Sequence, residues 1–148
     1  MKKILVINGP NLNMLGEREV EIYGKKTLSQ IKKDCEEFSQ EINYEIIFFQ
    51  SNSESKIIEC LQNMKDKYAG LIINAAALTH TSIAIHDCLK IVNCKKIEIH
   101  ISNPYKRESF RSVSFLSPVV DGIISGFGNK VYVTAIFALK QMLEKVNE

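Results

Sequence analysis

An arginine and a tyrosine lie close together near the N-terminus of this 148-residue sequence, in a polar segment suited to acid/base chemistry. Arg18 lies in the run Glu17-Arg18-Glu19, and Tyr23 follows shortly afterwards, before Gly24. A phenol acts as a base only in its ionised form, which a nearby guanidinium group would stabilise. The pair is therefore a candidate base and its activator, although a tyrosine in a loop can equally pack on the surface.

A glutamate and a histidine form a second candidate pair. Glu98-Ile99-His100 lies in an expected strand, where side chains alternate, so the two polar groups share one face. A carboxylate in this position could orient the imidazole as a general acid or base. A buried histidine satisfied by a carboxylate is the structural alternative, but the polar residues Ser102 and Asn103 that follow favour a site.

Two arginines and another histidine are candidates for binding an anion. Arg107 and Arg111 are four residues apart, so they share a face if the segment is helical, and paired guanidinium groups suit a carboxylate. His80 precedes Thr81 and Ser82 at the expected start of a helix, which also favours anions. Simpler explanations remain open, namely a solvated basic surface for the arginines and helix capping for Thr81 and Ser82.

An alternation of strands and helices along the chain must position these residues. Apolar runs with polar boundaries predict the strands, and segments with helical periodicity predict the helices. The expected strands are 3–8, 45–49, 70–74, 96–101 and 122–124, and the expected helices are 28–41, 54–67, 81–91 and 129–145. Thr27 with Gln30 predicts a capping box for the first helix, and Ser53 a cap for the second.

This order of elements predicts an α/β fold with a doubly wound, five-stranded parallel sheet of order 2-1-3-4-5. Right-handed βαβ connections place helices on both faces, as near-continuous apolar strands such as Ile4–Ile7 require. Ligands of such sheets bind at the carboxyl ends of the strands, at the switch point between strands 1 and 3. The polar loops that begin at Asn8, Asn74 and Ser102 should therefore meet in one crevice. The loop of about 18 residues after strand 1 is long for a connection and suggests a functional lid.

Composition and charge narrow the class of protein. The length and the 45% of hydrophobic residues suit a single domain over residues 1–148. Basic and acidic residues are interspersed, with a net charge of +2, so there is no basic stripe that would bind nucleic acid. No apolar stretch approaches the roughly 20 residues that cross a bilayer. Four cysteines without a CxxC pair and three histidines without ligand-like spacing predict reduced thiols, no metal site and a cytoplasmic protein. Neither GxGxxG nor GxxxxGK[ST] occurs, so no nucleotide cofactor is expected.

Several motifs follow one another in a fixed order. They are Asn8-Gly9-Pro10-Asn11-Leu12-Asn13-Met14-Leu15-Gly16, Arg18-Glu19 with Tyr23-Gly24, Gln50-Ser51-Asn52, Thr79-His80-Thr81-Ser82, Glu98-Ile99-His100-Ile101-Ser102-Asn103, Arg107-Glu108 with Phe110-Arg111, and Leu116-Ser117-Pro118 before Gly122-Ile123-Ile124 and Gly126. This set resembles type II 3-dehydroquinate dehydratase over essentially the whole chain. The resemblance implies a flavodoxin-like fold and a shikimate-pathway hydro-lyase that converts 3-dehydroquinate to 3-dehydroshikimate without metal or organic cofactor.

The resemblance also implies how the residues share the reaction. Tyr23, ionised with the help of Arg18, would remove a proton alpha to the ketone, and Asn11 would help to stabilise the enolate oxygen. His100, held by Glu98, would then protonate the departing hydroxyl group. Base and acid on opposite sides of the substrate would make the reaction an anti elimination.

Further matches imply substrate contacts and an assembly. The implied contact residues are Asn74, His80, Asp87, Ile101, Ser102, Arg107 and Arg111, and Arg107 is also implied to be a second cation near Tyr23. Similar proteins form trimers that assemble into homododecamers, in which Asp87 would reach the site of a neighbouring subunit. Without the resemblance, Asp87 would be expected on a solvated helix face.

The sequence departs from the family pattern in two loops. Val20 stands where the family usually has proline, so the lid lacks the fixed φ of that residue, and Ala75–Ala77 replace positions that are often glycine or proline. These changes concern loop order and affinity more than the reaction. The alternative function is a flavodoxin-like binding or signalling module without catalysis, although strand 1 does not end in the acidic cluster of a phospho-acceptor.

Overall fold

A computed structural model of the protein describes residues 1–144. Its strands form one parallel sheet of order β2-β1-β3-β4-β5. The strands are β1 (Lys2–Asn8), β2 (Tyr44–Gln50), β3 (Gly70–Asn74), β4 (Lys95–His100) and β5 (Gly122–Ser125). The main helices are α2 (Leu28–Glu41), α3 (Glu54–Gln62), α4 (Ile83–Leu89) and α5 (Lys130–Leu143). The predicted α/β class and strand order are therefore confirmed.

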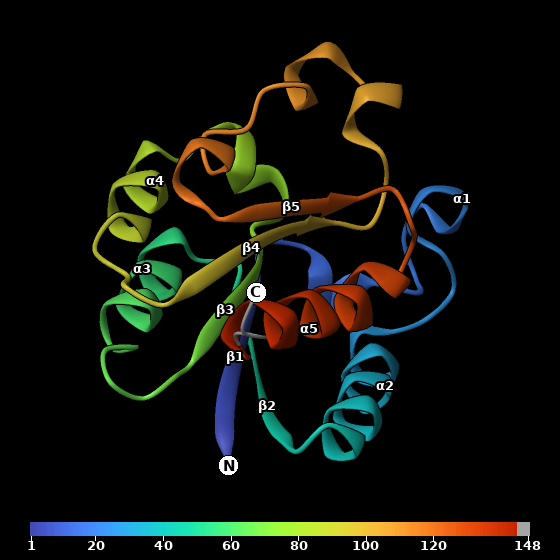
Figure 1. Ribbon diagram of the computed structural model, residues 1–148. Coiled ribbons are helices and arrows are strands. Elements are labelled where there is room, and N and C mark those ends of the chain that lie inside the picture. The colour runs from blue at the N-terminus through green and yellow to red at the C-terminus, as the bar shows by residue number, and fades with distance from the viewer. Residues whose placement is uncertain (145–148) are drawn as a thin grey trace.

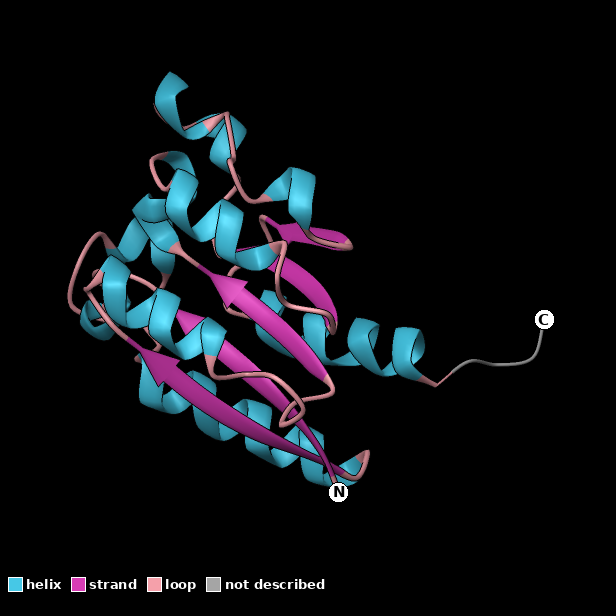
Figure 2. Ribbon diagram, turned by 90° about the vertical axis from the view of Figure 1, so that its left-hand side faces the viewer, coloured by secondary structure: helices cyan, strands magenta, loops and turns pink. Residues whose placement is uncertain are grey.

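Alternate residues of the central strands face opposite layers of helices. Ile4 and Val6 of β1 belong to a core cluster with residues of α2 and α5, whereas Leu5 and Ile7 belong to a second cluster with residues of α3 and α4. Figures 1 and 2 show these two pairs of helices on opposite faces of the sheet. Both faces of β1 are thus buried, which explains why the strand is apolar without alternation.

The predicted helix over residues 54–67 is too long, because α3 ends at Gln62. Asn63 is the C-terminal cap: its backbone N–H makes a helical bond to the carbonyl oxygen of Glu59, and its side-chain amide donates to the same oxygen. Asp66 then takes a left-handed φ of 62°, which a continuing helix excludes. A short polar side chain that bonds locally to the backbone competes with the helix here.

The predicted caps are confirmed at two helices, and at a third the structure decides between two candidate residues. Thr27 and Gln30 form both bonds of a capping box, and the Ser53 hydroxyl accepts from the helix that follows it. Ser82, rather than Thr81, caps α4, so this helix is shorter than the predicted 81–91. The predicted helix 129–145 corresponds to α5, but its expected last residue lies outside the described residues.

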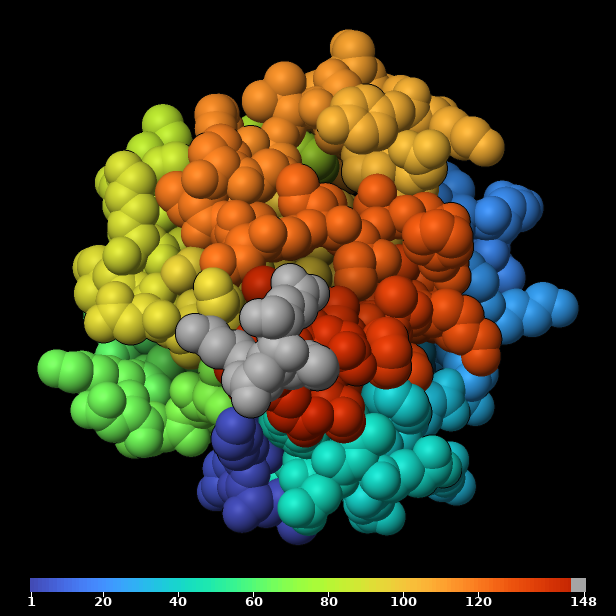
Figure 3. Space-filling view, in the orientation of Figure 1, coloured from blue at the N-terminus to red at the C-terminus, as the bar shows by residue number. Residues whose placement is uncertain are grey.

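The two connections that build the crevice lie beside each other at the carboxyl ends of the strands. The lid after β1 contains a 3-10 turn, η1 (Leu12–Met14), and the short helix α1 (Val20–Tyr23). The segment after β4 contains the 3-10 turns η3 (Pro104–Lys106), η4 (Ser109–Arg111) and η5 (Ser117–Val119). Figure 3 shows part of this segment, in gold and orange, next to the blue residues of the lid. No helix within residues 1–144 is long and apolar enough to span a membrane.

Candidate active site

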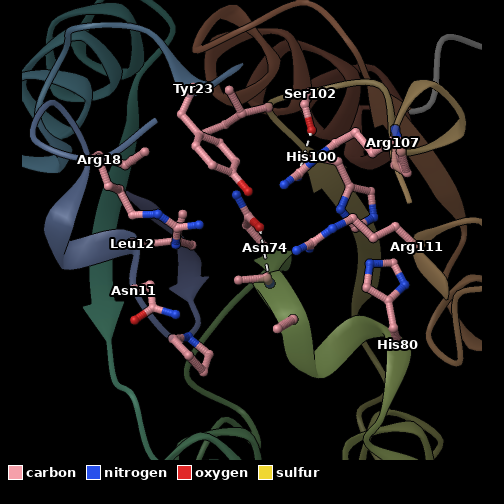
Figure 4. A pocket seen from close by; sticks show the side chains of 16 residues that line it. Asn11, Leu12, Arg18, Tyr23, Asn74, His80, His100, Ser102, Arg107 and Arg111 are labelled. Carbon is pink, nitrogen blue, oxygen red and sulfur yellow. Dashed lines mark hydrogen bonds between the residues drawn. The ribbon is translucent and has the colours of Figure 1, made fainter. Parts of the chain in front are cut away.

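The carboxyl ends of β1, β3 and β4 open into a pocket that the lid and the segment after β4 enclose (Figure 4). Among the residues that line it are ten of the predicted site residues, namely Asn11, Arg18, Tyr23, Asn74, His80, His100, Ile101, Ser102, Arg107 and Arg111. Glu98 lies behind His100 and does not line the pocket. The prediction that these polar loops converge on one crevice is therefore confirmed.

Tyr23 lies between two guanidinium groups. The Cζ atom of Arg18 is 4.8 Å from the centroid of the Tyr23 ring, and the Cζ atom of Arg107 is 5.1 Å from it. Arg18 comes from the lid and Arg107 from the segment after β4, so the ring joins the two connections. Both cations are close enough for a favourable electrostatic contact with the electron-rich face of the ring.

His100 is bonded to a fully buried carboxylate. Its Nε2 atom lies 2.5 Å from Oε2 of Glu98, as the predicted shared face of the strand requires. Burial by itself would raise the pKa of the Glu98 carboxyl. Hydrogen bonds from His100, Ser117 and Ser114 outweigh that effect and hold the pKa below its usual value. The carboxylate is therefore ionised and fixes Nε2 as the protonated ring nitrogen, which leaves Nδ1 for a ligand.

His80 stacks beside His100, with ring centroids 6.4 Å apart. Its Nδ1 atom lies 2.7 Å from the carbonyl oxygen of Val113, which can only accept, so this nitrogen carries a hydrogen. Burial lowers the pKa of His80, and the charges of His100 and Arg111 lower it further, against the carbonyl contact. The ring is thus neutral at pH 7, with Nε2 as a free acceptor.

The pocket is electropositive. Its lining residues, all of them within the described chain, include three arginines and no aspartate or glutamate. Arg107 donates to the Ser102 hydroxyl at 3.3 Å, and the Nε atom of Arg111 donates to Glu108 at 2.8 Å. The two arginines do not share a helix, because Arg107 is extended between η3 and η4. They still face one cavity, and together with Arg18 they select an anionic ligand.

A buried chain of hydrogen bonds behind the pocket was not predicted. Tyr132 of α5 is fully buried, and its hydroxyl donates to Oδ1 of Asn8 at 2.6 Å and accepts from Nδ2 of Asn74 at 3.2 Å. The Asn8 amide donates in turn to the carbonyl of Phe49, and Oδ1 of Asn74 accepts from the N–H of Ala76. A backbone carbonyl and a backbone N–H end the chain, so both amides have only one possible orientation.

Two further contacts of the site also escaped prediction. Ser114 and Ser117 donate to the two oxygens of Glu98 at 2.8 Å and 2.6 Å. Ser117 lies in the Leu116-Ser117-Pro118 motif, which supported the resemblance without suggesting a role. A role for Asn8 was easier to foresee, because it is a polar residue at the end of β1, where it pairs with Asn74 at the end of β3.

Besides Glu98, which bonds His100 from behind the pocket wall, Asp87 is the predicted site residue that does not line the pocket. It is exposed on α4 and does not line the cavity. A contact with a neighbouring subunit remains a prediction for this residue. The described residues contain no group of three or more His, Cys, Asp or Glu side chains that could hold a metal ion.

Comparisons with known proteins agree on one family. The family model described as dehydroquinase class II matches residues 2–140. A 3-dehydroquinate dehydratase of Caldicellulosiruptor bescii is 49% identical over 97% of this chain and 100% of its own length. Another, from Buchnera aphidicola, is 51% identical over 98% of this chain and 99% of the relative.

Solved structures with this fold give the same result. A type II dehydroquinase from Butyrivibrio crossotus superimposes with a TM-score of 0.92 at 45% identity, covering 95% of this chain and 98% of the other. A type II dehydroquinase from Propionibacterium acnes gives a TM-score of 0.90 at 37% identity, with 98% of both chains covered. These matches do not favour the alternative of a binding or signalling module.

Proposed function

The chain belongs to the dehydroquinase class II family, and from that premise we propose how its residues carry out the family's reaction. It is an enzyme that removes water from 3-dehydroquinate in the shikimate pathway. The assignment of roles depends on one observation. A single cationic pocket holds Tyr23 between two guanidinium groups and also holds His100, which is bonded to a carboxylate. The reaction needs a base, a group that stabilises an enolate, and an acid.

The base is Tyr23 in its ionised form. Its oxygen takes the proton alpha to the ketone, and the electron pair of the broken C–H bond forms an enolate. Arg18 and Arg107 stabilise the phenolate before the proton moves. Asn11, on the pocket wall, stabilises the negative oxygen of the enolate through its side chain.

The acid is His100. Collapse of the enolate breaks the bond between carbon and the departing hydroxyl, which takes a proton from Nδ1 and leaves as water. The bond from Nε2 to Glu98 keeps the ring oriented and stabilises its protonated form. We expect an anti elimination, in which base and acid act on opposite sides of the substrate; Tyr23 enters the pocket from the lid and His100 from β4 (Figure 4).

The substrate is bound by the groups that the pocket leaves unpaired. Arg111 keeps its terminal nitrogens for the carboxylate, since Glu108 takes only its Nε. His80 offers an acceptor to a hydroxyl group, and Asn74 offers the second hydrogen of an amide whose other hydrogen bonds Tyr132. The remaining contacts come from the backbone of Ile101 and from the Ser102 side chain.

The working enzyme is a homododecamer built as a tetramer of trimers, with one catalytic domain per chain. This assembly would bring Asp87, which is exposed on α4, to the site of a neighbour. Light scattering should give a mass of roughly twelve chains of 16.8 kDa, and a monomer would contradict the proposal. We also propose a cytoplasmic location, because all four cysteines are free thiols, which cell fractionation would test.

Turnover tests the proposed function. Purified, assembled protein should convert 3-dehydroquinate to a conjugated product that absorbs in the ultraviolet, at a rate that a chelator leaves unchanged. Tyr23→Phe and His100→Ala should each lower kcat by about 100-fold or more, with the fold intact. Tyr105→Phe is a matched control, because Tyr105 is 78% exposed and lies outside the pocket. No turnover by the wild type would refute the activity, and near wild-type turnover in either variant would remove that residue's role.

A further inference from the structure

One side of the catalytic pocket is held by a short segment, residues 113–117, which we call the strap. Its central residue, Phe115, donates its N–H to the carbonyl of Thr79 at 2.9 Å. His86 of α4 bonds the carbonyl of Phe115 at 2.5 Å, and His80 bonds the first carbonyl of the strap at 2.7 Å. Three hydrogen bonds therefore hold the strap against the turn after β3 and against α4.

The two serines of the strap are directed at Glu98. The Oγ atom of Ser114 accepts from the backbone N–H groups of Leu116 and Ser117, each at 3.1 Å. These bonds occupy both lone pairs of the hydroxyl, so its hydrogen can only point to Oε2 of Glu98, 2.8 Å away. Ser117 donates to the other carboxylate oxygen at 2.6 Å.

Glu98 therefore receives three donors although it is fully buried. A carboxylate without such partners would be costly at this position and would take up a proton. We propose that Ser114 and Ser117 are positioning residues for His100, which they control through Glu98. The proposal rests on the proposed role of His100 as the acid.

The physical effect concerns where a shared proton resides. In the state that protonates the leaving group, one proton lies between Nε2 of His100 and Oε2 of Glu98. The serine bonds stabilise the negative carboxylate, so this proton stays on the imidazole and the ring remains a cation. Without them the carboxylate is more basic and takes the proton. A neutral ring is then left to donate from Nδ1, and it is a poor acid.

Other charged or titratable groups face His100, and they stay in place when a serine is changed. They are His80 from the turn after β3, Arg107 and Arg111 from the segment after β4, and Arg18 and Tyr23 from the lid. None of these groups makes a hydrogen bond to either serine among the described residues. A change in titration after a serine substitution would therefore report on Glu98 and His100.

The test uses Ser117→Ala, Ser114→Ala and the double variant of the assembled enzyme. Ser117→Ala should lower kcat by about tenfold, while KM stays within about twofold, because the acid and not the binding surface is affected. Titration of 15N-histidine-labelled protein by solid-state NMR should show the apparent pKa of the pair rising by about one unit. In a plot of kcat against pH, the change that is due to the His100–Glu98 pair should also move to higher pH.

Controls separate this role from general packing. Ser112→Ala removes a hydroxyl that bonds only Ser109, on the exposed side of the same segment, and should change neither kcat nor the titration. Ser117→Thr keeps the hydroxyl and should restore both. If Ser114→Ala fails to fold, because its oxygen also holds two backbone groups, Ser117→Ala decides the question alone.

Two results would overturn the proposal. One is a Ser117→Ala enzyme with the wild-type kcat, pH profile and His100 titration. The other is a loss of kcat with an unchanged titration, which would indicate a merely structural role. Absence of turnover in the wild type would instead refute the proposed function. The NMR titration would still test whether the two serines control the protonation of His100 and Glu98.

Discussion

Removal of the charge of Arg18 should slow proton abstraction by an amount that the structure allows us to work out. Its guanidinium carbon is 4.8 Å from the Tyr23 ring centroid. Two opposite charges at that separation attract by about 3 kcal/mol at an effective dielectric constant of about 20. The Arg18 side chain is 33% exposed and is paired with Glu19 at 2.8 Å, so water and this carboxylate both reduce the effect. About 2 kcal/mol is a reasonable value for Arg18→Gln, which corresponds to roughly a 30-fold lower kcat near neutral pH.

The pH dependence of the loss identifies its cause. In the proposed mechanism the phenol acts as the base only when it is ionised, and a nearby cation favours the ionised form. The ratio of wild-type to Arg18→Gln activity should therefore be largest at low pH and shrink as the pH rises. Initial rates of product absorbance, followed across the stability range of the enzyme, would measure this ratio.

Two companion variants make the test specific. Arg18→Lys keeps a positive charge in the lid and should recover much of the lost activity. Lys25→Gln removes an exposed charge from the same loop and should leave the rate unchanged, because Lys25 does not line the pocket. A loss in Arg18→Gln that is the same at every pH would refute the electrostatic reasoning, as would activity within about threefold of wild type.

Two stability predictions follow from the packing behind the site. Tyr132→Phe leaves buried hydrogen-bonding groups of Asn8 and Asn74 unpaired, and should lower the free energy of unfolding by about 1–3 kcal/mol in urea titrations; an unchanged midpoint would contradict this. Gly9→Ala would place a Cβ atom 2.4 Å from the carbonyl oxygen of Ala75, so thermal unfolding should begin at a markedly lower temperature. Wild-type thermal stability of that variant would show that the loop relaxes freely.

Much of the fold was predictable because local signals agreed with each other. The apolar run Ile4–Ile7 indicated a strand buried on both faces, and the two core clusters confirm that reading. The capping box at Thr27 was readable because both partners lie within one turn. The end of α3 was not, because a local bond from Asn63 competes with a helical pattern that continues beyond it.

The candidate site was predictable where polar residues follow the strands. The alternation of β4 placed Glu98 and His100 on one face, and they do form a bond. Ser114, Ser117 and Tyr132 gave no comparable signal. A serine in a loop and a tyrosine in an amphipathic helix are ordinary residues until the partners of their hydroxyl groups are known.

The sequence by itself determined the order of strands and helices, the end of the sheet at which chemistry occurs, and the residue types available there. Only the tertiary structure decided that the Tyr132 hydroxyl joins Asn8 to Asn74, and that two serines hold Glu98. The physical reason is range. Periodicity and capping act within a few residues, whereas hydrogen bonds and charge pairs act between segments that only the folded chain brings together.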